Sequence, residues 1–121
     1  MSLKKVSNII EALGRHEDKD AIRVLCELGT NHQSDEVREL TARALIKRNS
    51  KEALEVVIKN KGKGINDLSA RVAMTAINEL LALKEKENAI QILEETLSNS
   101  ETEQEVQDTA RSVKALMSFS S

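Results

Sequence analysis

The chain has 121 residues, of which 40% are hydrophobic and 31% are charged, and its formal net charge is −2. This length is enough for one domain with a real core, and the composition is that of a globular rather than a disordered chain. No apolar run approaches the roughly 20 residues that a membrane-spanning helix needs. No apolar segment follows Lys4 and Lys5 as in a signal peptide. We therefore expect a single domain over residues 1–121 that does not enter a membrane.

The residue composition favours an all-helical fold. It also favours a location in a reducing compartment. Proline is absent, so helices can form almost anywhere along the chain. Strand-forming residues are few outside 56–58, and Phe119 is the single aromatic residue, so the core must consist of Leu, Ile, Val, Ala and Met. The lone Cys26 cannot form an internal disulfide, and a cytoplasmic location is expected.

The first two helices are predicted before residue 30. Apolar residues at helical spacing predict the first over 3–13, with Gly14 as its C-cap. The second starts from a cap at Asp18 or Asp20 and ends at Gly29. The side chains expected to point inward from these two helices are Val6, Ile9, Ile10, Leu13, Ile22, Leu25, Cys26 and Leu28.

The central helix is predicted from Asp35 to about Lys47. Ser34 is its N-cap candidate, because a serine hydroxyl can accept a hydrogen bond from the first free backbone N–H groups. Acidic residues in the first turn complement the helix dipole. Apolar and small residues then recur at i, i+3, i+4, i+7 and i+8, which is one face of an amphipathic helix. These residues are Val37, Leu40, Thr41, Ala44 and Leu45.

Four further helices follow, each with a capping signal or a turn before it. The caps are expected at Asn49 with Glu52 three residues on, at Asn66 or Asp67, and at Ser100 with Glu103. Residues 118–121 are expected to form a frayed tail. The inward residues predicted for the four helices are Ala53, Leu54, Val57, Ile58, Leu68, Val72, Ala73, Ala76, Ile77, Leu80, Leu83, Ala89, Ile90, Leu93, Leu97, Val106, Ala110, Val113, Leu116 and Met117.

The longer helices recur at a nearly constant interval. Their predicted caps at Ser34, Asn66 and Ser100 are 32 and 34 residues apart. A period near 33 with two helices per unit is typical of an α-solenoid, in which stacked neighbours complete each other's core. The fold class predicted is therefore all-α: a right-handed α-α superhelix of about three helix pairs plus an N-terminal helix.

Residues 32–45 resemble the second helix of a HEAT repeat, in the variant named after the phycobilisome lyases. The match consists of Glu36-Val37-Arg38, Ala44 and Leu45, with Thr41 at the first small position, whereas residues 32–35 replace the usual acidic-proline turn. Weaker copies lie at 69–80, where Arg71 is shifted by two positions, and at 106–117, where Gln107 replaces the arginine. The resemblance implies a structural role for Arg38 and a concave face formed by the second helices. A tetratricopeptide array has the same period, but it normally carries aromatic residues that this chain lacks.

Residues that carry chemistry in other proteins occur here without the necessary spacing. His16 and His32 lie in separate predicted turns and do not converge on a metal. Cys26 is predicted on an apolar helix face, where no base shares its turn. The stretch 59–64 lacks the glycine and lysine spacing of a phosphate-binding loop and follows a helix. The sequence therefore predicts neither enzyme activity nor a metal or cofactor.

Charge is distributed unevenly along the chain. Residues 38–63 contain eight cations and three acids, a balance of +5, whereas residues 85–108 contain eight acids and one cation, a balance of −7. Along a superhelix this gradient becomes a dipole, which can steer a partner or favour self-association. It can equally reflect two solvated faces.

The leading functional hypothesis is a non-enzymatic scaffold that binds another protein on its concave face. One alternative is a nucleic-acid-binding module that uses the basic stretch 38–63, although stacking aromatics are missing. A second is an accessory subunit resembling a bilin lyase. A third is a structural role, as a piece of a longer solenoid or as a homodimer through its exposed ends. The residues predicted to contact the protein partner are Arg43, Lys47, Arg71, Thr75, Asn78, Arg111 and Lys114.

Overall fold

The computed structural model describes residues 3–16 and 18–119, and within them the chain is all-helical, with seven α-helices and no strand. The π-helical segment η1 (Cys26–Thr30) continues α2, and two short 3₁₀ turns, η2 (Asn60–Gly62) and η3 (Ile65–Asp67), connect α4 to α5. The α-helices are α1 (Leu3–Arg15), α2 (Asp20–Leu25), α3 (Asp35–Arg48), α4 (Lys51–Lys59), α5 (Ala70–Ala82), α6 (Glu87–Ser98) and α7 (Gln104–Phe119).

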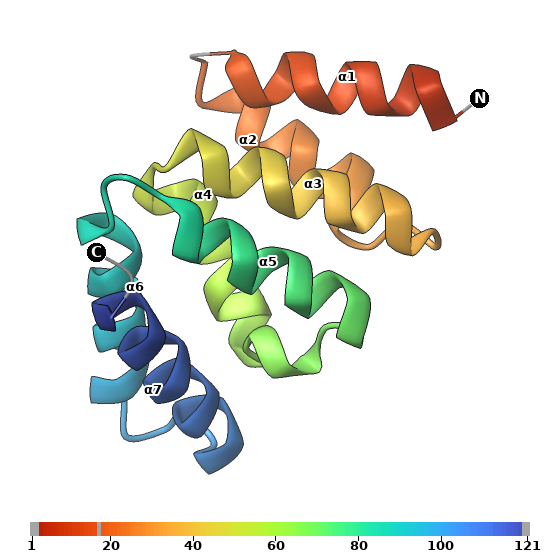
Figure 1. The fold of residues 1–121 in the computed structure, drawn as a ribbon. Helices are drawn as coiled ribbons and strands as arrows, with labels where there is room; N and C mark the ends of the chain where they lie inside the picture. Colours follow the sequence, from red (N-terminus) through yellow and green to blue (C-terminus); the bar gives the residue numbers. More distant parts are fainter. Residues whose placement is uncertain (1–2, 17, 120–121) are drawn as a thin grey trace.

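Helices that alternate in the sequence lie side by side in space. α3 packs against α1 on one side and against α5 on the other, and α4 packs against α6. In Figure 1, α1, α3 and α5 form a row, α2 and α4 lie behind it, and α6 and α7 lie at the end remote from α1. α7 contacts both α6 and α5. The all-helical class predicted from the sequence is therefore confirmed.

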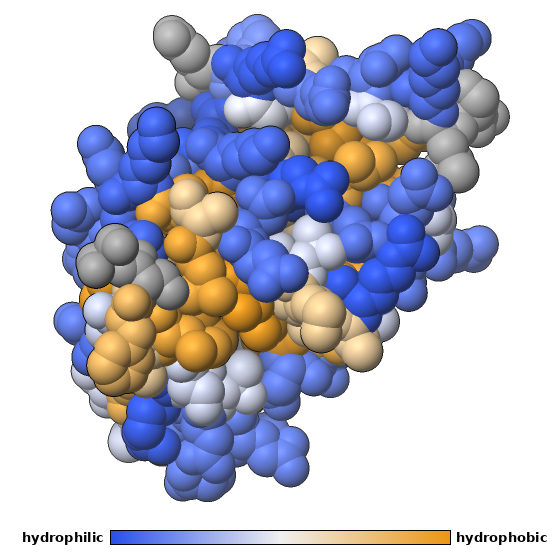
Figure 2. Space-filling view, viewed as in Figure 1, coloured by the Kyte–Doolittle hydropathy of each residue, from blue (hydrophilic) through white to orange (hydrophobic). Residues whose placement is uncertain are grey.

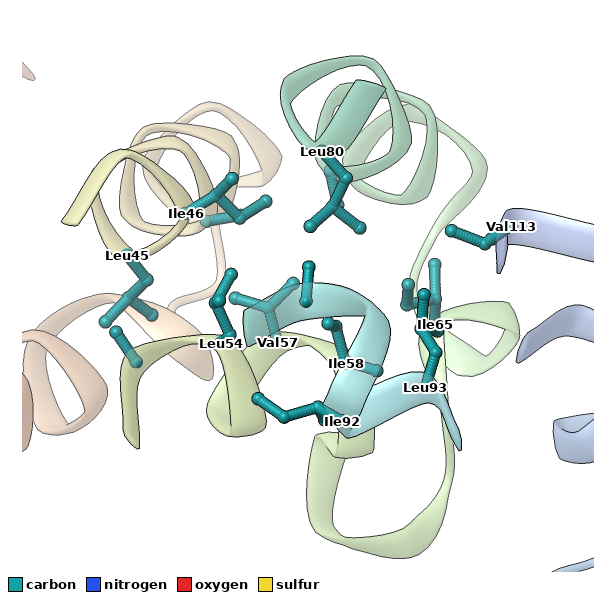
Figure 3. Close-up of a cluster of buried hydrophobic side chains, with 14 of the residues drawn as sticks. Leu45, Ile46, Leu54, Val57, Ile58, Ile65, Leu80, Ile92, Leu93 and Val113 are labelled. Atoms are coloured by element: carbon teal, nitrogen blue, oxygen red, sulfur yellow. The ribbon is translucent and has the colours of Figure 1, made fainter. Parts of the chain in front are cut away.

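One hydrophobic core connects these helices. Figure 3 shows Leu45 and Ile46 of α3 and Leu80 of α5 on one side of it, facing side chains of α4 and α6. All four apolar residues predicted for α4 are buried, as expected for a short helix between two layers. They are Ala53, Leu54, Val57 and Ile58.

Three side chains that were predicted to point inward are exposed. Ile9 of α1, Leu28 of η1 and Leu116 of α7 keep 39%, 42% and 48% of their surface accessible. α1 and α7 lie at the ends of the helix array, so each has neighbours on one side only. Leu28 lies in η1, whose wider π turn changes the angular position of the residues within it.

α3 is buried around much of its circumference because α1, α4, α5 and η1 all contact it. Ala42 and Ile46 are therefore buried in addition to Val37, Thr41 and Leu45 of the predicted stripe, whereas its other two members, Leu40 and Ala44, are only partly buried. The Thr41 hydroxyl donates a 2.8 Å hydrogen bond to the Val37 carbonyl, which satisfies it inside the core. A single apolar stripe thus underestimated the burial of the central helix.

The predicted roles of Gly14 and Gly29 as helix ends are wrong. Gly14 lies inside α1, and a Cβ atom built on it would lie 3.0 Å from the Cβ atom of Ala44. Gly29 lies inside η1 against α3. Both glycines therefore mark points where another helix approaches α3 closely.

Several caps differ from those predicted. Ser34 has the extended backbone of an N-cap, but its side chain makes no capping hydrogen bond. Ser50, rather than Asn49, caps α4 by accepting from the Ala53 N–H at 3.2 Å. Asn49 instead ends α3 in the left-handed conformation, with φ of 54°.

The starts of the last two long helices also differ. Asn66 and Asp67 form the turn η3, and Ser69 caps α5 by accepting from the Val72 N–H at 3.4 Å. α7 begins at Gln104, so Ser100 lies before it. α3, α5 and α7 therefore begin at residues 35, 70 and 104, an interval of 35 and then 34. α7 continues through residues 118 and 119 of the predicted tail, and residues 120–121 lie outside the described part.

Candidate partner-binding face

The facing sides of α3 and α5 carry a network of charged and polar side chains. Arg43 Nε of α3 lies 2.9 Å from Glu79 Oε1 of α5. Glu39 of α3 forms an ion pair with Arg71 of α5 and accepts a 2.5 Å hydrogen bond from the Thr75 hydroxyl. Three of the residues predicted to contact a partner therefore also connect two helices of the protein itself.

Glu39 is the centre of this network. The hydrogen bond from Thr75 lowers the pKa of its carboxyl, and the positive charges of Arg71 and Arg43 lower it further. Only 16% of the Glu39 side chain is accessible, and this burial by itself raises the pKa, but the Thr75 hydrogen bond and the two arginines outweigh it. The negative charge of Glu39 offsets part of the positive charge expected on this face.

Sequence analysis did not identify Glu39 and Glu79 as part of the site. The signal that was present is an interval: Arg43 and Glu79 are 36 residues apart, and so are Glu39 and Thr75. This interval is close to the spacing of the helix starts, so polar residues about 36 positions apart were candidates for a bond between helices. The register of α3 against α5 decides which of them meet.

Other bonds connect neighbouring helix pairs at similar intervals. Lys59 Nζ at the end of α4 lies 3.2 Å from Glu95 Oε2 of α6, again 36 residues on. In the turns, Asn49 Nδ2 donates to the Glu85 carbonyl at 2.9 Å, and Asn88 Nδ2 donates to the Asn49 carbonyl at 3.0 Å. These bonds hold successive helix pairs in one register.

Arg38, for which the HEAT resemblance implies a structural role, makes its ion pair within α3. The partner is Asp35, one turn earlier in the helix. The neighbouring helix reaches the same carboxylate through the Ser69 hydroxyl, which donates to Asp35 Oδ1 at 3.3 Å. The Arg38 side chain therefore forms its ion pair within the first turns of its own helix.

The remaining predicted contact residues lie in three different settings. Lys114 Nζ of α7 lies 3.5 Å from Glu94 Oε1 of α6, and Arg111 pairs with Asp108 within α7 at 3.1 Å. Lys47 and Asn78 are exposed on α3 and α5. The structure thus brings Arg43, Arg71 and Thr75 into one network, whereas Arg111 pairs within α7 and Lys114 pairs with α6.

A groove lies between α1 and α3, with a volume of about 380 Å³. Its apolar lining comes from Gly14, Leu40 and Ala44. Figure 2 shows the corresponding strip of hydrophobic surface between the hydrophilic side chains of the two helices. The charged residues that line it are Glu11, Arg15, Arg43 and Lys47. Two residues predicted from the sequence, Arg43 and Lys47, therefore border an open apolar depression.

Another apolar area is exposed around α5 and α7. Met74 of α5 keeps 65% of its surface accessible and Phe119 at the end of α7 keeps 87%. Figure 2 shows hydrophobic surface where these two helices lie side by side. This hydrophobic surface lies on the face of the molecule that Figures 1 and 2 show, as α3 and α5 do.

The cysteine and the two histidines each have a defined local environment. Burial raises the pKa of the Cys26 thiol, which lowers its reactivity. His16 and His32 each accept, through Nδ1, a hydrogen bond from a backbone N–H two residues later. No group of three His, Cys, Asp or Glu residues among the described residues could hold a metal ion.

None of the helices in the described residues is long and apolar enough to cross a bilayer. No protein-family model matches the chain, and neither a curated protein nor a solved structure gives a significant match.

Proposed function

We propose that the protein is a non-enzymatic interaction module that binds a protein partner on the side formed by α1, α3, α5 and α7. The observation that carries the proposal is the α3–α5 network around Glu39, which holds these two helices in a fixed register beside the α1–α3 groove. A surface whose geometry is fixed before binding loses less conformational entropy when a partner docks.

The proposal includes a helix-pair superhelix of the HEAT type as its architecture. Its support is the 34- to 36-residue interval that recurs in the helix starts and in the bonds between neighbouring pairs. In such an arrangement each pair contacts mainly the next one, and the second helices form a continuous surface. The cytoplasmic location expected from the unpaired Cys26 belongs to the same proposal.

The contact residues have two roles in this proposal. Lys47 and Asn78 are exposed and reach the partner directly. Arg43, Arg71 and Thr75 hold the surface together through Glu39 and Glu79. The two arginines offer their remaining N–H donors to the partner, whereas the Thr75 hydroxyl has given its one donor to Glu39 and can only accept. Lys114 and Arg111 extend the surface along α7.

The nucleic-acid alternative receives less support from the contacts. Within the basic stretch, Arg38, Arg43 and Lys59 are each paired with a carboxylate. Arg48 donates to the backbone carbonyls of His16 and Asp18, which ties the α1–α2 turn to the end of α3. These four cations are therefore already engaged in ion pairs or hydrogen bonds within the protein, which leaves them less available to bind phosphate groups.

Position-resolved photocrosslinking tests the proposal. A photoreactive phenylalanine is placed at Asn78 on α5, at Lys47 on α3, or at the exposed Gln91 on α6 as a matched control. In lysate of the source cell, the first two positions should crosslink the same protein, identified by mass spectrometry, and the control should not. Equal products from all three positions, or none from any, would contradict the proposed face.

A further inference from the structure

We propose that the α1–α3 groove binds an acidic peptide segment that places an apolar side chain over Leu40 and Ala44, with its carboxylates against Arg15 and Lys47. This inference rests on the proposed function and specifies the chemistry of the partner. It follows from the shape of the groove, from its charge and from its apolar lining.

The shape results from the close approach of the two helices. A Cβ atom on Gly14 would lie 3.0 Å from the Cβ atom of Ala44, so the backbones meet over two small residues. The longer side chains around them then stand above a depression of about 380 Å³. A space of this size accommodates one or two large apolar side chains.

The charge around the groove is positive, although the whole chain carries −2. Arg15, Arg43 and Lys47 line it together with the single carboxylate of Glu11. Arg43 is partly balanced by Glu79, whereas Arg15 and Lys47 form no ion pair with another described residue. Complementary charge favours an acidic partner and repels a basic one.

The apolar lining distinguishes a peptide from a nucleic acid. Leu40 and Ala44 are only partly buried by α1, so an apolar side chain of the partner would cover surface that is now exposed to water. A phosphate backbone gains nothing from such a lining, and the groove contains no aromatic residue on which a base could stack. A peptide in which acidic residues flank a leucine, isoleucine, methionine or phenylalanine matches both the positive charge around the groove and its apolar lining.

Fluorescence polarisation with the full chain tests the inference directly. The first probe is a labelled 14-residue amphipathic peptide of Glu and Leu. In the second probe Lys replaces Glu, and in the third Ala replaces Leu. The Glu–Leu probe should bind, more weakly as salt is added, and both altered probes should bind at least about tenfold more weakly.

Two variants with the same change in charge locate the site. R15Q/K47Q removes the two groove cations that form no ion pair with another described residue, and glutamine keeps a long side chain that favours helix. K61Q/K63Q makes the same change in the exposed loop after α4, where neither residue lines the groove. Circular dichroism confirms that both variants remain folded. We expect R15Q/K47Q to lose about tenfold in affinity for the Glu–Leu probe and K61Q/K63Q to match the unmodified chain.

Other outcomes would overturn the inference in distinguishable ways. Equal affinity for the Lys–Leu probe would exclude recognition of acids, and equal loss in both variants would show a nonspecific charge effect. Stronger competition by a single-stranded oligonucleotide than by unlabelled peptide would favour nucleic acid. Light scattering that shows a dimer lost only in R15Q/K47Q would make a second copy the occupant. If the probe fails while Asn78 and Lys47 still crosslink one protein, the acidic-peptide inference is wrong and the proposed function stands.

Discussion

Gly29 and Thr41 meet where η1 lies against α3, and a Cβ atom on Gly29 would lie 1.7 Å from Thr41 Oγ1. The same hydroxyl donates to the Val37 carbonyl, so it cannot turn away without losing its hydrogen bond. Gly29 is buried and Thr41 is almost completely so. The absence of a side chain at residue 29 therefore allows the second helical segment to dock on the central helix.

Replacing Gly29 with alanine should destabilise the protein. The added methyl group must displace η1 or Thr41, and such overpacking costs about 1–3 kcal/mol. The free energy of unfolding is measured by urea denaturation, followed by circular dichroism. G29A/T41A should recover part of the loss, because Thr41 Oγ1, the atom nearest to the added methyl group, is removed. A G29A chain as stable as the unmodified one would show that η1 does not lie this close to α3.

Glu39 should contribute stability that depends on pH. Its pKa is lower in the folded chain than in the unfolded chain, so the contribution is present above the ordinary glutamate pKa. It is lost as the pH falls through the lower folded value. At neutral pH, E39Q should unfold more easily by about 1 kcal/mol or less, and this difference should shrink on acidification.

The matched control for Glu39 is Glu55, which is exposed on α4. E55Q should change the unfolding free energy little and should follow the pH dependence of the unmodified chain. A difference between E39Q and the unmodified chain that stays constant down to low pH would contradict the linkage.

Ser50 and Ser34 provide a matched pair for helix capping. Ser50 Oγ accepts from the Ala53 N–H, whereas Ser34 has the same backbone conformation and no capping bond from its side chain. S50A should therefore lower the unfolding free energy by about 1 kcal/mol, and S34A should have little effect. Equal losses in the two variants would mean that Ser34 also caps its helix in solution.

The Arg43–Glu79 pair should behave as a structural connection. R43E places two carboxylates together and should destabilise the chain, whereas the exchanged variant R43E/E79R should restore much of the loss. The coupling expected for such a half-exposed pair is up to about 1 kcal/mol. A double-mutant cycle by urea denaturation measures it. A coupling energy of zero would show that the pair does not stabilise the fold, and partner binding would then be the one proposed role left for Arg43.

Cys26 should react slowly with thiol reagents. Burial raises the pKa of its thiol, and the thiolate is the reactive form. Alkylation by iodoacetamide at neutral pH should be slower than that of a free cysteine and should accelerate when urea unfolds the chain. Reaction at the rate of free cysteine in the folded chain would show that this part of η1 is open.

Much of the helical pattern was predictable from the sequence. The positions of the helices and most buried residues follow from apolar spacing, as the four buried residues of α4 show. Capping was less predictable, because Asn49 and Ser50 are both good cap residues. The turn conformation decided between them: Asn49 adopts the left-handed conformation that ends α3, and Ser50 is left to start α4.

The candidate site was partly predictable. Arg43, Arg71 and Thr75 were identified because they are polar and lie on the outer sides of the long helices. Glu39 and Glu79 were missed, and so was the groove beside Gly14. Local patterns show which side of a helix is polar, but they do not show which neighbour it faces.

The sequence by itself determined that the chain forms helices with apolar faces, because helix formation and amphipathicity depend on residues three and four apart. Only the tertiary structure decided that Glu39 lies between Arg71 and Thr75, and that Gly14 and Gly29 are points of contact rather than helix ends. Those outcomes depend on the distance and register between helices about 35 residues apart. Packing of the whole core sets that register, so no short stretch of sequence contains it.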